Sequence, residues 1–301
     1  MSLIAFFGAI ETGLLYGLVG LGVYFSFRIL NFPDLTVDGS FPLGGAVTAT
    51  LIVQGMNPLL ATGIACLAGG LAGFCTAWLN VQLKILNLLA SILTLIALYS
   101  INLRIMGRPN VPLLGQSTIL TPLSGFFRGM PQGLGVPLVL LGIVAIAKVG
   151  VDLFLNSELG LAMRATGANP DMARSQGIPT GKIILLGMAM SNSLVALAGG
   201  LFAQMNGFAD VTMGVGTIVL GLAAVIIGET LISGSTVQRA TVGVLVGSVM
   251  YRIAVAIALN ADFIGFQAQD LNLITAVLVT LALVLPNMRH SLPAFLKRRK
   301  L

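Results

Sequence analysis

Two aspartates four residues apart form the clearest chemical pattern in the sequence. Asp34 and Asp38 follow Pro33, a residue that interrupts helices, and they share one face if the chain between them is helical. Carboxylates in an apolar protein can carry a proton or line a polar path. The alternative is that they cap the start of a helix. The residues alone leave both interpretations open.

Side chains for catalytic or metal chemistry are scarce. The chain has one histidine, His290, and two cysteines, Cys66 and Cys75, whose spacing puts them on opposite faces of a helix. A metal site needs a cluster of such ligands, and a serine nucleophile needs a well-placed base. We therefore expect no catalytic residue, no metal site and no cofactor in this chain.

The composition places the chain in a membrane. Of its 301 residues, 56% are hydrophobic and only 9% are charged, whereas soluble domains have about 25% charged residues. The mean hydropathy is +0.99. These values exclude a soluble enzyme, a nucleic-acid-binding protein and a disordered chain. The formal charge of +6 is therefore interpreted through membrane topology rather than through a nucleic-acid partner.

The apolar runs predict an all-α protein with about nine membrane spans, in a range of about eight to ten. The runs lie at 3–27, 39–55, 58–80, 86–106, 136–155, 183–205, 211–231, 237–259 and 271–288. The second and the seventh are the weakest, because each starts in a polar, Gly-rich stretch. The first run lacks a basic flank and a cleavage site, which favours a retained helix. Residues 1–301 are expected to form a single membrane domain.

The cations give the spans a direction. With the C-terminal run 297–300 in the cytoplasm, about 12 cations lie inside and about 3 outside, in accord with the positive-inside rule. This orientation predicts an external N-terminus, an external loop at 107–135 with a short helix at 123–129, and a cytoplasmic loop at 156–182. If 39–55 is a re-entrant segment, the N-terminus would lie inside instead.

Two stretches of the sequence resemble each other. Residues 31–39 follow a long apolar run and precede a Gly-rich one, and residues 206–212 do the same in the second half. An odd number of predicted spans separates them, so the two units would have opposite orientations. Transporters built from inverted repeats bind their substrates near such interrupted helices. The alternative is a chance likeness between Gly-rich membrane helices.

The cytoplasmic loop contains the signals of a short helix. Asn169 suits the N-cap, Pro170 the first helical position, and Asp171 the positive end of the helix dipole. Gly177 suits the left-handed position after the helix. We expect a surface helix that seats in a groove of a partner protein; the alternative is an ordinary connecting loop.

The same loop resembles a known family. Three segments are similar to permeases of branched-chain amino acid ABC importers. The first is residues 160–178, with the pattern Gly-x-x-x-Arg-Ala-x-Gly-x-Asn-x-x-x-Ala-x-x-x-Gly-Ile. The others are the following helix from 182 to 200 and, near the N-terminus, residues 17–22 followed by 29–34. In that family a small residue follows an Asn-Phe pair. In this chain the pair is Asn31-Phe32, and it is followed by Pro33 and by the acidic residues Asp34 and Asp38. The pattern is closer to that of tryptophan/tyrosine-type uptake permeases.

The resemblance implies a type II ABC importer-like fold and two groups of functional residues. Coupling to an ATPase would use Arg164, Gly167, Asn169, Pro170, Asp171, Ala173, Arg174 and Gly177. For the substrate pathway we expect Asn31, Phe32, Asp34, Asp38, Asn192 and Asn206.

The resemblance also implies partners. They are an ABC ATPase dimer, a second permease copy, an external substrate-binding protein and the lipid bilayer of the bacterial inner membrane. The chain would move a small solute inward, an amino acid or a related compound. Residues 177–183 fail the phosphate-loop pattern in glycine spacing and in lacking a final Ser or Thr. ATP and Mg²⁺ would therefore bind the partner ATPase, and this chain would not be an enzyme.

Two other classes remain open on the residues alone. An ion-coupled secondary transporter or channel would use carboxylates buried in the membrane, such as Asp34, Asp38 and Glu229. An intramembrane enzyme ranks last because the histidine stands alone. Glu11, Arg104 and Arg252 also fall within or at the edges of spans, where structural pairing is the simpler interpretation.

Overall fold

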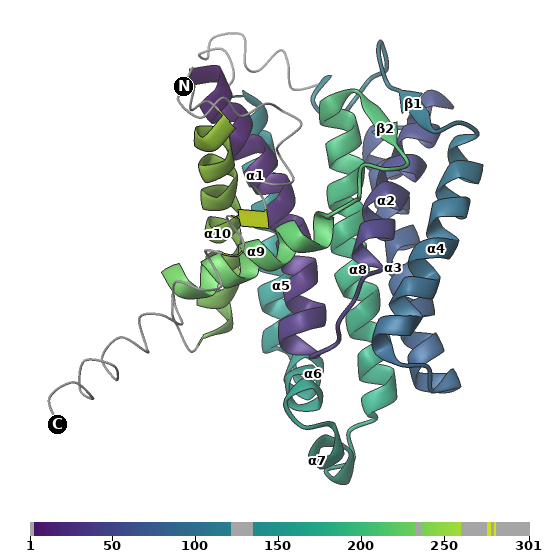
Figure 1. Cartoon of the computed structure of the whole chain (residues 1–301), viewed down its shortest axis with the longest axis vertical. Helices are drawn as coiled ribbons and strands as arrows, with labels where there is room; N and C mark the ends of the chain where they lie inside the picture. Colours follow the sequence, from purple (N-terminus) through teal and green to yellow (C-terminus); the bar gives the residue numbers. More distant parts are fainter. Residues whose placement is uncertain (1–2, 122–134, 233–235, 260–275, 278–279, 281–301) are drawn as a thin grey trace, which may run out of the picture.

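Long helices run side by side along the molecule, with a small two-stranded ribbon at one end (Figure 1). The computed structural model describes residues 3–121, 135–232, 236–259, 276–277 and 280. The elements are α1 (Leu3–Val23), the π-helix η1 (Tyr24–Ile29), α2 (Val37–Val53), α3 (Pro58–Leu83), α4 (Asn87–Met106), β1 (Asn110–Pro112), α5 (Gly135–Asn156), α6 (Glu158–Ala168), α7 (Pro170–Ser175), α8 (Thr180–Asn206), β2 (Phe208–Asp210), α9 (Thr217–Leu231) and α10 (Val237–Leu259). We call the end with β1 and β2 the ribbon end, and the end with α6 and α7 the loop end.

Six of the described helices are long and apolar enough to cross a membrane: α1 continued by η1, α3, α4, α5, α8 and α10. The apolar helices α2 and α9 have 17 and 15 residues, fewer than the roughly 20 that a span needs. They correspond to the two weakest predicted runs, so the prediction of about nine full spans is not confirmed. The expected helix at 123–129 and nearly all of 271–288 lie outside the described residues.

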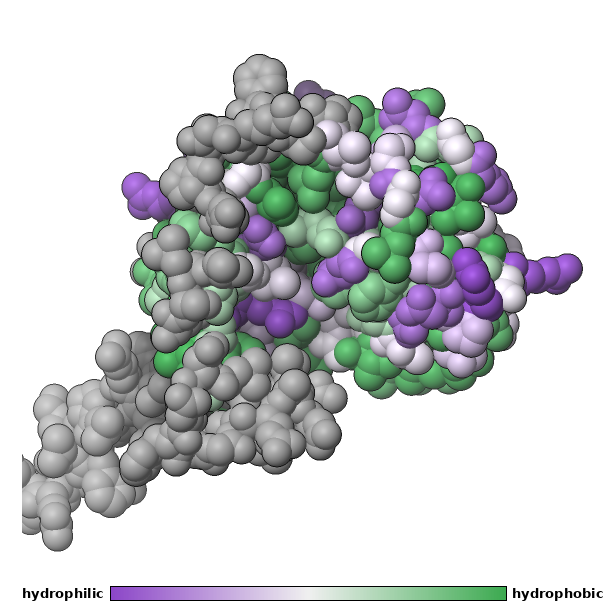
Figure 2. All heavy atoms as spheres, turned by 90° about the horizontal axis from the view of Figure 1, so that it is seen from above, coloured by the Kyte–Doolittle hydropathy of each residue, from purple (hydrophilic) through white to green (hydrophobic). Residues whose placement is uncertain are grey.

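Apolar side chains cover the flanks of the bundle. Large apolar residues on α3, α4 and α5 are mostly exposed, among them Leu71, Ile96 and Ile146. Seen from the ribbon end, polar residues gather over the end face, while apolar residues lie around its rim (Figure 2). A membrane around the flanks would remove this apolar surface from water.

The central helix is α8, and small residues bring its neighbours close. A Cβ at Gly199 of α8 would collide with the carbonyl oxygen of Phe41 on α2. A Cβ at Gly44 of α2 would collide with Ala196 of α8, and one at Gly73 of α3 with the carbonyl oxygen of Met188. Close backbone approach through glycine is how helices pack in membranes, where no hydrophobic force draws them together.

The two short helices begin inside the bundle. After η1 ends at the loop end, the chain turns back and α2 starts about halfway along the molecule (Figure 1). After α8 and β2, the chain returns inward and α9 crosses the bundle obliquely. Each short helix thus follows a long one, in the order that the sequence resemblance between 31–39 and 206–212 suggested.

The ribbon joins the two connections at its end of the molecule. β1 and β2 pair antiparallel, with Val111 opposite Ala209, and both of these residues are buried. The all-α expectation therefore needs a small correction. Strands of three residues carry too few side chains for an alternating pattern to predict them.

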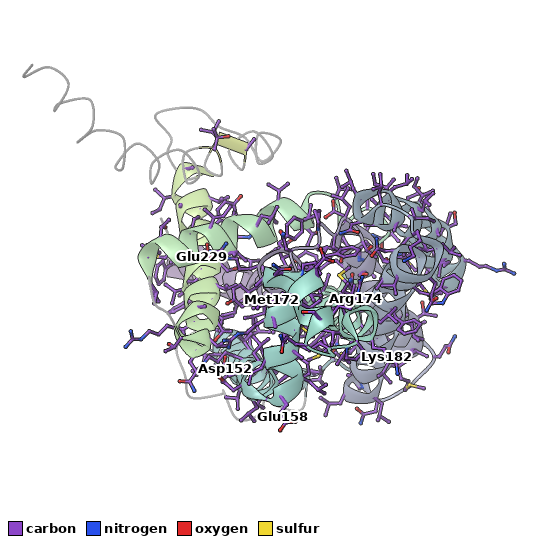
Figure 3. All side chains as sticks on the ribbon, turned by 90° about the horizontal axis from the view of Figure 1, so that it is seen from below. Asp152, Glu158, Met172, Arg174, Lys182 and Glu229 are labelled. Atoms are coloured by element: carbon purple, nitrogen blue, oxygen red, sulfur yellow. The ribbon has the colours of Figure 1, made fainter. Side chains whose placement is uncertain are left out.

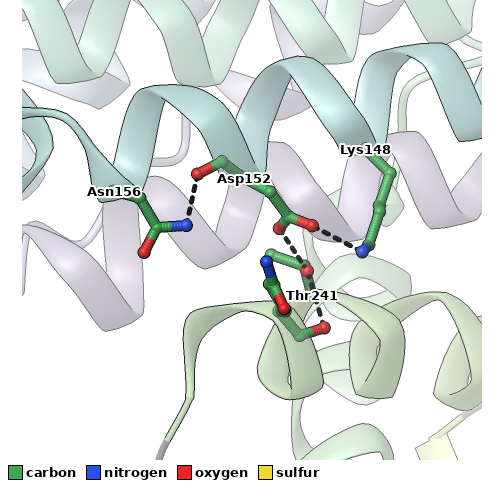
Figure 4. Close-up of polar contacts among 5 residues, drawn as sticks. Lys148, Asp152, Asn156 and Thr241 are labelled. Atoms are coloured by element: carbon green, nitrogen blue, oxygen red, sulfur yellow. Dashed lines mark hydrogen bonds and ion pairs between the residues drawn. The ribbon is translucent and has the colours of Figure 1, made fainter.

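A buried polar contact holds α5 against α10 (Figure 4). Lys148 and Asp152 form an ion pair at 2.5 Å, one helical turn apart on α5. The second carboxylate oxygen of Asp152 accepts a hydrogen bond from the Thr241 hydroxyl on α10 at 2.6 Å. Because both sides of the carboxylate are satisfied, a charge can remain at a position that is only 7% exposed.

Candidate functional site

Asp34 is buried at the start of the first short helix and is held by hydrogen bonds. Its Oδ1 accepts from the Thr36 N–H at 2.9 Å, and its Oδ2 accepts from the Asn192 side-chain amide at 2.8 Å. The Asn192 side-chain oxygen in turn accepts from the Ser40 hydroxyl at 2.7 Å. This network ties the segment before α2, α2 itself and α8 into one polar cluster within the membrane domain. All of its members are fully buried.

The second short helix is preceded by the same turn. Asp210 Oδ1 accepts from the Thr212 N–H at 2.8 Å, as Asp34 Oδ1 accepts from the Thr36 N–H. Both turns belong to a Phe-x-Asp-x-Thr sequence, which begins at Phe32 in one half and at Phe208 in the other. An aspartate that bonds to the backbone two residues on forms a turn that interrupts a helix. The two halves therefore break their helices with the same local device.

Asp38 links the two short helices. Its carboxylate accepts from the N–H of Ile218 at 2.8 Å and from the N–H of Gly216 at 3.2 Å. Gly216 is the N-cap residue of α9 and its φ is +81°, a conformation that suits glycine. A carboxylate at free backbone N–H groups satisfies them and favours the positive end of the helix dipole. Asp38 on α2 thus caps α9 from the other half of the chain.

A cavity of about 280 Å³ lies beside this cap. Its lining comes from α2, α4 and the segment between β2 and α9: Asp38, Gly39, Pro42, Leu95, Tyr99, Asn102, Val211, Thr212 and Val215. Most of these side chains are apolar, and Asp38 is the charged member of the described lining. A largely apolar cavity with a few polar groups is the usual form of a small-molecule site.

At the loop end, α6 and α7 project beyond the bundle (Figures 1 and 3). The side chain of Asn169 accepts from the Met172 N–H at 3.0 Å and caps α7, and Gly177 has a φ of +84°. The helix signals in the sequence are therefore confirmed. Ala173 is 4% exposed and packs against its own chain, whereas Met172 is 62% exposed. Met172 lies near the middle of this end of the molecule (Figure 3).

Helix α6 lies directly on the break that follows α1. A Cβ at Gly167 would collide with the carbonyl oxygen of Ile29, the last residue of η1. Arg28 of η1 forms an ion pair with Glu229 of α9 at 2.6 Å. The end of α1 is therefore in contact with both the projecting loop and the loop-end part of α9.

The residues expected along the pathway fall into separate places. Asp34 and Asn192 belong to the closed polar network, and Phe32 is buried. Asp38 lines the cavity. Asn31 lines a different hollow at the loop end, with Arg164 and Gly167. Asn206 bonds back to the Phe202 carbonyl oxygen near the ribbon end.

Several residues at these sites were missed from the sequence, and three of them matter most for the argument. Asn102 and Tyr99 line the cavity beside Asp38, and Met172 is the exposed apolar residue of α7. The polar Asn102 within an apolar span was an available signal. Tyr99 and Met172 carried none, because aromatic and methionine residues are common in membrane helices and their connections.

Known proteins are similar in sequence to this chain over most of its length. The model of a family described as branched-chain amino acid transport system, permease component, matches residues 5–285. The chain belongs to this family of permeases. It is 41% identical to a tyrosine transport system permease protein of Clostridioides difficile, over 93% of this chain and 90% of that protein.

More distant relatives carry other names. The permease is 26% identical to a probable branched-chain amino acid transport permease protein of Methanocaldococcus jannaschii, over 83% of this chain and 81% of that one. It is 25% identical to a ribose import permease protein of Escherichia coli, over 85% of this chain and 78% of that one. No solved structure matches the chain. The permease is thus a transmembrane subunit of the ABC type, and its relatives include permease proteins named for amino acid transport and for ribose import.

Proposed function

We propose that the permease is the membrane subunit of a binding-protein-dependent importer that moves an amino acid into the cell. A separate ATPase dimer, which holds ATP and Mg²⁺, drives the movement by alternating access. Two permease copies work with an external binding protein in the bacterial inner membrane. The tyrosine transport permease, at 41% identity, favours an aromatic amino acid as the substrate.

The observation that supports coupling is the contact chain at the loop end. The exposed Met172 on α7 offers an apolar side chain to a partner. Behind it, α6 rests on the backbone of Ile29 through Gly167. Arg28, the preceding residue, is paired with Glu229 on α9. A push on the projecting loop would thus reach both the break after α1 and α9.

The two interrupted helices support an inverted repeat. Each half places an Asp-x-Thr turn before a short helix, and Asp38 of one half caps the short helix of the other. Substrate sites in inverted-repeat transporters lie where such helices meet. The cavity beside Asp38 is lined by α2 and by the segment before α9, which supports it as the substrate site.

Uptake into proteoliposomes tests the proposal. The permease is reconstituted with an ATPase and a binding protein from the same organism, and entry of radiolabelled tyrosine, leucine and ribose is followed with and without ATP. We expect ATP-dependent entry of tyrosine. Entry that follows an ion gradient and ignores ATP would favour a secondary transporter instead.

Coupling is tested with a matched pair of methionines. Met172→Asp places a charge on the projecting loop and should abolish ATP-driven uptake. Met56→Asp changes the same residue type at a half-exposed position in the turn between α2 and α3, and should leave uptake close to the parental rate. Equal uptake by the two variants would remove α7 from the coupling contact.

A further inference from the structure

One residue that lines the cavity beside Asp38 has a buried side-chain oxygen that nothing in the described structure satisfies. Asn102 on α4 is 1% exposed, and its amide nitrogen donates to the Gly39 carbonyl oxygen at 3.2 Å. Among the described residues, its side-chain oxygen Oδ1 has no hydrogen-bond partner. The donor role of the amide nitrogen fixes which side-chain atom is the oxygen. A buried polar atom left unpaired costs about 1–3 kcal/mol, so the cavity favours a ligand that donates to it.

The carboxylate of Asp38 also favours a ligand that donates hydrogen bonds. Each oxygen of Asp38 accepts one backbone N–H, while an ionised carboxylate has about four acceptor positions. No Lys or Arg belongs to the described lining of the cavity, and no described cation forms an ion pair with Asp38. The site therefore has spare acceptor capacity and negative charge, with no side-chain cation to balance it.

The remaining walls limit the shape of the ligand. Pro42, Leu95, Val211 and Val215 supply apolar surface, and Tyr99 adds an aromatic ring. A volume of about 280 Å³ lies just below the roughly 300–1,000 Å³ of most ligand pockets. The cavity suits a small solute with an apolar body.

We propose that this cavity binds the primary ammonium group of the transported solute, with the Asp38 carboxylate and Asn102 Oδ1 as acceptors. An ammonium group has three N–H donors and no acceptor, so it has enough donors for both groups, and the Tyr99 ring in the same lining is a surface that cations favour. A carboxylate in the same place would face Asp38 and leave Asn102 Oδ1 unpaired. The inference rests on the proposed function, because it names the part of the substrate that this permease recognises.

A cysteine reporter tests the site in the purified permease without its partners. Cys66 and Cys75 are replaced by Ala, and Val215→Cys is introduced, since Val215 lines the cavity and is 80% exposed. The rate at which a methanethiosulfonate reagent modifies this cysteine is measured in increasing concentrations of phenethylamine or of 2-phenylethanol. The two probes share an apolar body, and only the amine carries an ammonium group.

We expect phenethylamine to slow the modification at concentrations at least about tenfold below those of 2-phenylethanol, which corresponds to about 1.4 kcal/mol. Asp38→Asn keeps an oxygen that can cap α9 but removes the charge, and should weaken protection by the amine about tenfold. Asn102→Ala removes the unpaired acceptor and should weaken protection by the amine at least about threefold. The expected effect is smaller than that of Asp38→Asn because the Asn102 oxygen is neutral. Glu158→Gln removes a negative charge at an exposed position of α6, outside the cavity lining, and should leave protection in place.

Equal protection by the two probes, or protection by neither, would overturn the proposal. So would an Asp38→Asn variant that is protected like the parent, or a Glu158→Gln variant that loses as much protection. If Asp38→Asn does not fold, Asn102→Ala decides. The outcome is separable from that of the uptake experiment. Amine-selective protection without ATP-driven uptake would refute the proposed function alone, and ATP-driven uptake without such selectivity would refute this site alone.

Discussion

Replacing Gly167 by Ala should destabilise the permease, although helix propensity alone predicts the opposite. Gly167 lies in the last turn of α6. Within a helix, Ala is favoured over Gly by about 0.5–1 kcal/mol. At this position, however, the new methyl group would collide with the carbonyl oxygen of Ile29. Because the obstacle is backbone rather than a side chain that can rotate away, α6 or η1 must shift.

The size of the effect follows from these opposing terms. Overpacking of this kind costs about 1–3 kcal/mol and occasionally more, which exceeds the gain in helix propensity. Gly142→Ala on α5 is the control, because nothing lies within 4 Å of a Cβ there and only the propensity term acts. The propensity gain is common to both variants, so they should differ by the overpacking cost, about 1–3 kcal/mol in unfolding free energy.

The comparison is made by thermal unfolding of the purified permease in detergent. At about 2–4 °C per kcal/mol, Gly167→Ala should melt on the order of 2–12 °C below Gly142→Ala. It should also lose ATP-driven uptake at temperatures at which both variants are folded. If Gly167→Ala melts together with Gly142→Ala or above it, α6 does not rest on η1 and the proposed transmission from the loop to the break is wrong.

Three further outcomes are expected. Asn192→Ala, which leaves a buried carboxylate and a hydroxyl without their partner, should cost about 3 kcal/mol in thermal unfolding, and a loss under about 1 kcal/mol would mean that the network is not closed. The Arg28 and Glu229 side chains are 63% and 36% exposed, so a double-mutant cycle on the two residues should give a coupling of about 0.2–1 kcal/mol that falls with added salt. A larger, salt-independent value would contradict this. In a cysteine-free background, Met172→Cys should react with an impermeant reagent only after permeabilisation and Ser117→Cys without it, and labelling of both from one side would refute the predicted orientation.

Local features of the sequence predicted local features of the fold. The bounds of α3, α4, α5, α8 and α10 lie within a few residues of the predicted runs, because length and hydropathy decide where a helix can cross a membrane. The cap and stop of α7 were predicted from Asn169 and Gly177, since both act on residues next to them in the chain.

The candidate site depended on contacts between distant segments and was predicted only in part. The sequence singled out Asp38, yet the groups that it caps lie 178 and 180 residues away. No pattern near Asp38 encodes that distance. Asn102 stood out as a polar residue in an apolar span, but its place beside Asp38 depends on α4 meeting α2 and could not be predicted from its neighbours. The shared Phe-x-Asp-x-Thr sequence was readable in both halves, but its turn became visible only in the structure.

The hydrogen bonds between the two halves can form only after the second half has been synthesised. Asp34 and Asn192 are 158 residues apart, so at about 5–20 residues per second the ribosome makes Asp34 roughly 8–30 s before its partner. During that interval the first half is already entering the bilayer with two carboxylates that lack their final hydrogen bonds. A charged group without a partner is costly in hydrocarbon. The segment around Asp34 must therefore wait near water, or within the insertion machinery, until α8 and α9 arrive to enclose it.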